Sequence, residues 1–266
     1  VAKAQASDMA GFTAALKDIG NPVFHEFAAD RHGDAFYGQV TAVPHLTQDK
    51  LKRCVKGVGA LLADATSNAI FGMDGSTSDC EWGEDADSPA GTGLFGYEAR
   101  PKILTRGVVG NSNNSYWLSD ANNPLTGYPF VLGWMGPEGK QQFLRTRINH
   151  LMIAQRLAAT DGLSETPKFD LLTLQGLMYA NRVYGAEIVL DDTLQICADY
   201  LAAPPIAASD EQLQALADSC EVLGNWDRKV ELDSRGAQVF TEYWAAIRDA
   251  RGNDFQNVVD DQDFWL

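Results

Sequence analysis

The periodicity of the apolar residues changes near the middle of the chain, between Pro124 and Pro137. After Pro137, apolar residues recur at helical spacing along five stretches, which begin near Phe143, Phe169, Ala186, Asp210 and Ala237. Before Pro124, short runs of β-branched and aromatic residues alternate with turn residues, a pattern typical of strands. The chain is therefore predicted to be α+β, with a strand-bearing segment over residues 1–136 and a helical region over residues 137–266.

The first half contains one clear hairpin signal. The runs VFHEFAAD and DAFYGQVTAVP flank the turn Asp30-Arg31-His32-Gly33, and ILTRGVVG further along predicts another short strand. A helix is predicted before the hairpin, with Ser7 as its N-cap and with apolar residues at helical spacing: Met9, Phe12, Leu16 and Ile19. Residues 46–64 favour no single element, whereas residues 71–97, rich in Gly, Ser and Asp, predict a long loop.

Composition and charge exclude several classes of protein. The 266 residues are 45% hydrophobic, enough for a core, and carry a formal net charge of −15. Scattered Lys and Arg residues cannot form the basic surface that nucleic acids or anionic membranes require. No apolar run reaches the roughly 20 residues of a spanning helix. The first residues lack the regions of a signal peptide, so the chain is either cytosolic, or processed, or does not start at the natural N-terminus; Val1 favours the latter two.

The four cysteines form two pairs along the chain, Cys54 with Cys80 and Cys197 with Cys220. They include no CxxC motif, and no neighbouring histidine completes a zinc set. Two local disulfides are the simplest interpretation, and buried free thiols are the alternative. Disulfides would place the protein in an oxidising compartment.

No complete catalytic set can be recognised from the residues alone. The sequence has no GxSxG, HExxH, Walker or GxGxxG motif. The four histidines lack metal-ligand spacing: His25, His32, His45 and His150. Adjacent carboxylates such as Asp191-Asp192 and Asp260-Asp261 are typical of helix starts and solvated tails.

The stretch from Gly110 to Gly127, GNSNNSYWLSDANNPLTG, concentrates five asparagines around one tryptophan. Asparagine is common in turns, because its side chain bonds nearby backbone and tolerates left-handed dihedral angles. The alternative is that one amide donates to a developing oxyanion. A fixed neutral donor of this kind lowers an acyl-transfer barrier by roughly 3 kcal/mol.

This stretch, with Tyr128 and Pro129, resembles a segment in the β-chain of the penicillin acylase family, in the branch of acyl-homoserine lactone acylases and aculeacin-type acylases. Further parts resemble the same β-chain in the same order: FAADRHGDAFYGQVTAVPHL, the loop ending SDCEW, the helical cysteine pair and GNWDRKVELDSRGAQVF. The resemblance implies an N-terminal nucleophile hydrolase with an αββα core, made as a precursor that cleaves itself and exposes a β-chain serine whose α-amine serves as base.

The position of the resemblance implies that the chain is an internal segment of that β-chain. VAKAQASDMAGF resembles a region well inside the β-chain, and VVDDQDFWL stops well before the family's C-terminal portion. Val1 has no nucleophilic side chain, so the nucleophile is expected outside these residues and the segment alone is expected to be inactive. The expected partners are an N-acyl amide substrate and the remaining α-chain and β-chain segments, with no nucleic acid and no membrane.

Site residues follow from the resemblance position by position. The family's oxyanion asparagine is the third residue of NSNxS, which is Asn113, while its neighbours in the motif are expected to hold the turn. Val23 and Phe24 match positions that line the acyl pocket, and ordinary strand core is the alternative. Arg145 and Arg147 resemble an arginine pair at the active-site rim, with helix-surface charges as the alternative.

The resemblance also bears on metals, cofactors and thiols. Pro44 resembles a carbonyl ligand for calcium in one branch, but Pro124 falls near the place of that branch's carboxylate, so we expect no metal and no organic cofactor. Export of the family implies a periplasmic or secreted protein with disulfides Cys54–Cys80 and Cys197–Cys220. A secreted helical binding or scaffold domain on an acylase framework is the rival interpretation, because Asn113 could persist in an inactive relative.

Overall fold

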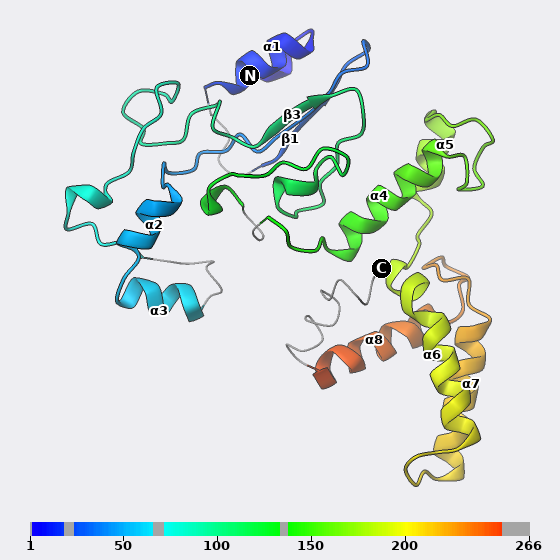
Figure 1. Cartoon of the computed structure of the whole chain (residues 1–266). Helices are drawn as coiled ribbons and strands as arrows, with labels where there is room; N and C mark the ends of the chain where they lie inside the picture. The colour runs from blue at the N-terminus through cyan, green and yellow to red at the C-terminus, as the bar shows by residue number, and fades with distance from the viewer. Residues whose placement is uncertain (1, 19–23, 66–71, 134–137, 252–266) are drawn as a thin grey trace. The chain divides into compact units, whose positions relative to one another are not determined.

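A computed structural model describes residues 2–18, 24–65, 72–133 and 138–251 of the chain (Figure 1). It divides into two compact units, Val1–Lys140 and Gln141–Leu266. The first contains short helices and a three-stranded sheet, and the second is helical. The α+β class predicted from the sequence is confirmed.

The sheet is antiparallel throughout, with the strand order β1-β2-β3. Strands β1 (Glu26–Ala29) and β2 (Ala35–Gly38) form the predicted hairpin, and β3 (Lys102–Thr105) overlaps the first three residues of the predicted ILTRGVVG strand. Asp30 shapes the turn, because its Oδ1 accepts from the backbone N–H of His32 at 2.8 Å and of Asp34 at 3.1 Å. Gly33 has a φ of +91°, a left-handed conformation that glycine adopts without strain.

The two faces of the sheet pack against different parts of the first unit. Side chains alternate between faces along a strand, so the neighbours Phe36 and Tyr37 of β2 point in opposite directions. Phe36 joins Met9 and Leu16 of helix α1 (Met9–Leu16) in one apolar cluster. Tyr37 joins Tyr116 and Leu132 in another cluster. The second cluster connects the hairpin to the asparagine-rich stretch.

Helix α1 begins one residue later than the predicted cap implies. Asp8, not Ser7, is the N-cap, and its carboxylate accepts from the backbone N–H of Gly11 at 2.7 Å. Both residue types are good caps, so local propensity does not separate adjacent positions. The 3-10 helix η1 (Ala2–Gln5) precedes α1, and the predicted helical residue Ile19 lies outside the described residues.

The next part of the first unit is tied together by the disulfide Cys54–Cys80. Residues 46–64, ambiguous in sequence, contain α2 (Gln48–Cys54) and most of α3 (Val58–Ala65). Over the described part of the long loop, residues 72–97, the structure contains the 3-10 helix η2 (Ser78–Cys80) and otherwise irregular chain. The bridge connects the end of α2 to η2 and so restrains this loop.

The second unit contains five helices among its described residues, at the stretches where the periodicity predicts them: α4 (Leu144–Leu157), α5 (Leu171–Met178), α6 (Tyr184–Ala202), α7 (Asp210–Gly224) and α8 (Ala237–Arg251). Two have reciprocal capping boxes, Asp170 with Thr173 at α5 and Ser209 with Gln212 at α7. These short-range interactions explain why the helix starts can be read from sequence.

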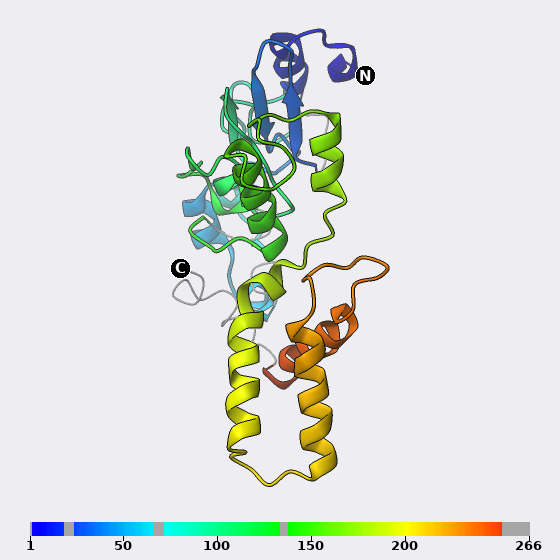
Figure 2. The ribbon, with the colours of Figure 1, turned by 90° about the vertical axis from the view of Figure 1, so that its right-hand side faces the viewer.

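Helices α6 and α7 run side by side as an antiparallel pair (Figure 2). The disulfide Cys197–Cys220 joins them, with a Cα–Cα distance of 6.5 Å. At the other end of the pair, Leu190 and Leu223 pack with Trp226 and with Phe240 of α8. The helical unit therefore has its own apolar core.

Candidate functional site

The NSNNS motif occupies a closed loop that follows β3. The backbone N–H of Gly110 donates to the carbonyl of Ser119 at 2.8 Å, and this bond joins the two ends of the loop. The 3-10 helix η3 (Tyr116–Leu118) forms its second half. Asn111 supports the turn, because its Nδ2 donates to the carbonyls of Asn114 at 2.9 Å and Ser115 at 3.3 Å.

Asn113 differs from its neighbours in this loop. Its side chain is exposed, and it has no hydrogen-bond partner among the residues that the structure describes, whereas Asn114 and Ser115 are buried. Its backbone φ is +67°, in the left-handed region that few residues other than glycine adopt and that asparagine tolerates best. The loop thus presents the Asn113 amide outward, where no described residue uses its donors or its acceptor.

The carboxylate of Glu138 holds the segment that follows Asn113. It accepts from the hydroxyl of Tyr116 at 2.5 Å, from the backbone N–H of Gly127 at 2.8 Å and from that of Tyr128 at 3.0 Å. The Tyr116 ring is 1% exposed and packs edge to face on the Tyr128 ring. Burial, followed by the nearby Glu138 carboxylate, raises the pKa of Tyr116. Partial burial would raise the pKa of Glu138, but the three donated hydrogen bonds lower it below its ordinary value.

A second set of contacts connects the same segment to the hairpin. The Ser119 hydroxyl donates to the Tyr116 carbonyl, and the Tyr116 side chain lies in the same apolar cluster as Tyr37 of β2. The Tyr37 hydroxyl lies 2.9 Å from Nδ1 of His25. Burial raises the pKa of Tyr37 and lowers the pKa of His25, because a low-dielectric environment disfavours their charged forms. The apolar cluster that contains Tyr37 and Tyr116 therefore connects β2 to η3.

Two polar atoms of the motif are buried and have no hydrogen-bond partner among the described residues. These are Oδ1 of Asn111 and Oγ of Ser115. Buried polar atoms in native proteins nearly always have partners, so these two mark the loop as a place where further polar contacts are expected.

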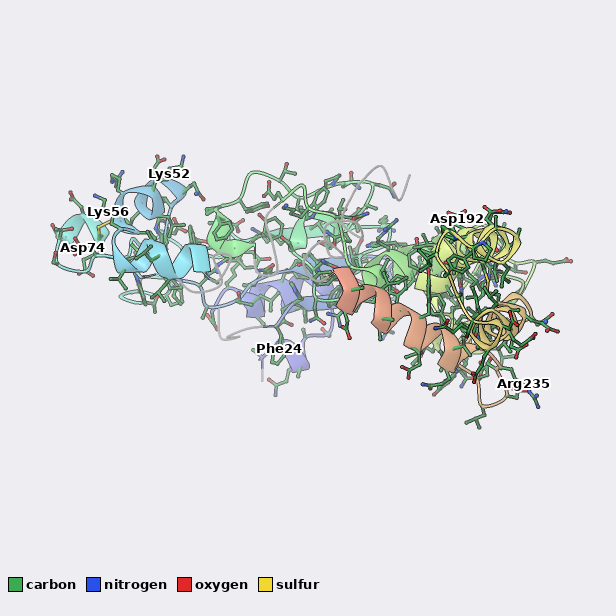
Figure 3. The ribbon with its side chains drawn as sticks, turned by 90° about the horizontal axis from the view of Figure 1, so that it is seen from below. Phe24, Lys52, Lys56, Asp74, Asp192 and Arg235 are labelled. Atoms are coloured by element: carbon green, nitrogen blue, oxygen red, sulfur yellow. A yellow bond between two sulfur atoms is a disulfide. The ribbon has the colours of Figure 1, made fainter. Side chains whose placement is uncertain are left out.

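The other sequence-predicted site residues come from other parts of the chain. Val23 lies outside the described residues, and Phe24 is 68% exposed at the edge of the first unit (Figure 3), before β1 begins. Arg145 and Arg147 lie on α4 of the second unit; Arg145 is exposed, and the Arg147 guanidinium lies 5.8 Å from the centre of the Tyr184 ring. The predicted disulfides Cys54–Cys80 and Cys197–Cys220 are both present.

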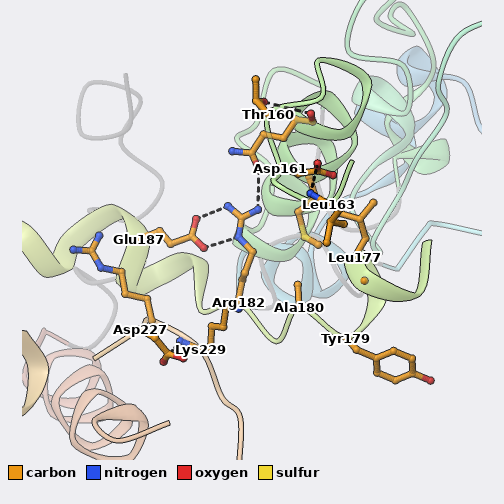
Figure 4. Close-up of a pocket in the computed structure, with 14 residues that line it drawn as sticks. Thr160, Asp161, Leu163, Leu177, Tyr179, Ala180, Arg182, Glu187, Asp227 and Lys229 are labelled. Carbon is orange, nitrogen blue, oxygen red and sulfur yellow. Dashed lines mark hydrogen bonds and ion pairs between the residues drawn. The ribbon is translucent and has the colours of Figure 1, made fainter. Parts of the chain in front are cut away.

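A cavity of about 480 Å³ opens in the second unit between α4, α5 and the start of α6 (Figure 4). Arg182 lies at its centre. The guanidinium donates through Nε and Nη2 to the Glu187 carboxylate, both at 2.7 Å, and through Nη1 to Oε1 of Gln155 at 2.8 Å. The Glu187 carboxylate raises the pKa of Arg182. Because these partners satisfy the guanidinium, we interpret the cavity as a structural ion-pair site.

A larger groove of about 740 Å³ lies between α6, α7 and α8, with mostly apolar walls that include Ile196, Leu216 and Tyr243. The described residues contain no group of three or more side chains able to hold a metal ion. Over the same residues, no helix combines the length and apolar character needed to cross a membrane.

Glu138 was not found by sequence reasoning. It lies 22 positions after Tyr116, in the short stretch Glu138-Gly139-Lys140, which matches no motif. A short-range pattern cannot report such a contact, because it depends on how the intervening chain returns to η3.

Comparison with known proteins supplies a family. The penicillin amidase family model matches residues 1–265. Aculeacin-A acylase from Actinoplanes utahensis is 37% identical over 84% of this chain and 27% of its own length. Acyl-homoserine lactone acylases PvdQ from Pseudomonas syringae pv. syringae B728a and Pseudomonas fluorescens Pf-5 are 27% and 29% identical, over 86% of this chain and 26% of theirs.

The chain spans about a quarter of the length of the curated relatives it matches. Within that span, the family match covers the asparagine loop, the hairpin and all the described helices. The chain therefore belongs to the penicillin amidase family.

Proposed function

We propose that these residues are part of an amidohydrolase that cleaves N-acyl amides to a carboxylic acid and an amine. Membership of the penicillin amidase family supports this proposal, as do relatives whose names describe acylases of aculeacin A and of acyl-homoserine lactones. The candidate substrates are acyl-homoserine lactones, lipopeptides and penicillins. Acyl transfer of this kind needs an activated nucleophile and an oxyanion hole, and no organic cofactor.

The observation that carries the proposal is the state of Asn113. Its amide is exposed, has no partner among the described residues and is presented by a left-handed backbone in a closed loop. A turn-forming asparagine would use its side chain on nearby backbone, as Asn111 does. We assign Nδ2 of Asn113 as a hydrogen-bond donor to the oxyanion of the tetrahedral intermediate.

The nucleophile in this proposal is an N-terminal serine outside these 266 residues, with its own α-amine as base. The described three-stranded sheet would form part of an αββα core in the complete acylase. Phe24, exposed in the first unit, would line the acyl pocket together with Val23, and Arg145 and Arg147 would lie near its rim.

The partners in this proposal are the remaining segments of the acylase. Helix α5 supports this, because its apolar side chains Leu171, Leu172 and Met178 are 70%, 76% and 67% exposed. A helix that is apolar on most sides is normally buried. The two disulfides support a periplasmic or secreted location, because such bonds persist in oxidising compartments.

The test is hydrolysis of a panel of N-acyl amides, followed by amine release. Three proteins are compared: the 266-residue chain, a complete acylase that contains it, and the Asn113→Ala variant of that acylase. We expect full activity only in the unmodified acylase, no activity in the 266-residue chain and a rate reduced by about 10²-fold or more in the variant. Full activity of the variant would refute the assignment of Asn113, and an inactive parent would favour a binding or scaffold protein.

A further inference from the structure

We propose that Glu138 is a positioning residue that fixes the Asn113 loop through Tyr116. The inference rests on the proposed function, in which Asn113 donates to the oxyanion. Glu138 does not touch the reacting atoms in this proposal. Its role is to hold η3, and through η3 the turn that presents the Asn113 amide.

The contacts of Glu138 form one clamp on three points of the chain. Oε1 accepts from the Tyr116 hydroxyl at 2.5 Å and from the Tyr128 backbone N–H at 3.0 Å, while Oε2 accepts from the Gly127 backbone N–H at 2.8 Å. Both ends of the segment from Tyr116 to Tyr128 are therefore held by a single carboxylate. Within the same segment, the backbone N–H of Leu125 donates to the carbonyl of Trp117 at 2.9 Å and brings these two residues together.

Tyr116 transmits this restraint to Asn113. It begins η3 three residues after Asn113, and its backbone carbonyl accepts from both the N–H and the hydroxyl of Ser119. Ser119 in turn closes the loop onto Gly110 at 2.8 Å. Glu138 thus holds the side chain of Tyr116 at its hydroxyl, and Ser119, which closes the loop, holds the backbone of Tyr116. A shift of the Tyr116 ring would move the turn that carries Asn113.

The clamp requires a group that only accepts hydrogen bonds. A carboxylate can accept all three donors, but a glutamine of the same shape would place either its NH2 group or its single oxygen at each position. One donor would then face another donor. An oxyanion donor must be held within about 0.5 Å of its productive position, so loosening the loop should reduce the rate of the chemical step more than substrate binding.

The experiment uses a complete acylase that contains these residues and compares Glu138→Gln, Asn113→Ala and the double variant. We expect Glu138→Gln to lower kcat about tenfold with KM changed less than about twofold, since misplacement of a catalytic group reduces the rate. The double variant should match Asn113→Ala within about twofold, because residues that act through one another are not additive. Chain cleavage and thermal unfolding are measured for every variant.

Two further variants sharpen the comparison. Tyr116→Phe removes only the hydroxyl that donates to Glu138, and it should also lower kcat, by about threefold. This variant replaces Glu138→Gln in the comparison if Glu138→Gln is too unstable to assay. Glu187→Gln removes a carboxylate that likewise uses both oxygens, on Arg182 of the second unit, and should leave kcat unchanged.

The outcomes separate this inference from the proposed function. Unchanged kcat in both Glu138→Gln and Tyr116→Phe would overturn the inference. It would also be overturned if Glu138→Gln lowered kcat by the same factor with and without the Asn113 amide, while Asn113→Ala alone retained only its strongly reduced, measurable kcat; the proposed function would then stand. Full activity of Asn113→Ala would remove the proposed role of Asn113, and the inference with it.

Discussion

Arg156 and Asp161 form an ion pair that is almost completely removed from solvent. Nη1 of Arg156 lies 2.7 Å from Oδ1 of Asp161, and the two side chains are 0% and 4% exposed. Nη2 of Arg156 also donates to the carbonyls of Ser164 at 2.5 Å and Thr166 at 2.9 Å. The pair therefore joins α4 to the loop that leads to α5.

Removing one partner of this pair should destabilise the helical unit strongly. Asp161→Ala leaves the guanidinium buried without its counter-charge, and the loss of one partner of a buried pair costs about 3 to 5 kcal/mol. Hydrogen exchange should show faster exchange in α4 and in residues 161–166. The double variant Arg156→Met/Asp161→Leu should lose less stability than Asp161→Ala, and equal losses would contradict a charge-based explanation.

The backbone and the amide of Asn113 can be tested separately. Asn113→Gly introduces a residue that adopts a φ of +67° without strain, whereas Asn113→Ala strains the backbone at this position by about 1 kcal/mol. Both remove the amide, so we expect equal loss of kcat but a lower unfolding temperature for the alanine variant. Amine-release assays and thermal unfolding of a complete acylase measure the two effects. Retained activity in the glycine variant would show that the amide is dispensable.

The disulfide Cys197–Cys220 should stabilise the α6–α7 pair by roughly 3 kcal/mol through loop-closure entropy. The double variant Cys197→Ser/Cys220→Ser should therefore speed hydrogen exchange in α6 and α7. The matched control is Cys54→Ser/Cys80→Ser, which should change exchange around α2 and leave α6 unchanged. Equal effects of both variants on α6 would contradict independent roles for the two bridges.

The Glu138 clamp should make the first unit sensitive to acid. The folded-state pKa of Glu138 is lowered below its ordinary value of 4.5 by its three donors. The unfolded chain therefore binds the proton more readily, so the stabilisation is complete above the ordinary pKa and is lost as the pH falls through the lowered one. Glu138→Gln should flatten the acid side of the unfolding temperature plotted against pH. An unchanged acid side would contradict the linkage.

The exposed face of α5 should matter only when the rest of the acylase is present. Leu172→Glu should reduce aggregation of the 266-residue chain, because it removes an exposed apolar side chain. In a complete acylase the same change should lower the unfolding temperature, since a charge would be buried at the contact. Leu232→Glu, at another exposed leucine, is the control and should leave that temperature unchanged. No effect of Leu172→Glu in the complete acylase would refute α5 as a packing face.

Short-range patterns predicted most elements of this fold. Helical spacing and capping residues predicted the helices of the second unit, and the turn Asp30–Gly33 between two apolar runs predicted the hairpin. These features depend on residues a few positions apart, so they can be read in one dimension. The cap of α1 was placed at Ser7 instead of Asp8, because adjacent capping residues compete and only the folded backbone selects one.

The sequence by itself determined the class of the fold, the positions of the helices in the second unit and the resemblance that singled out Asn113. Only the tertiary structure decided which neighbours support that residue. The clamp of Glu138 on Tyr116 and the apolar cluster shared by Tyr37 and Tyr116 join positions far apart in the chain. These contacts form only when η3 packs against Tyr37 of the sheet on one side and meets Glu138 on the other. No local pattern of residue types contains that information.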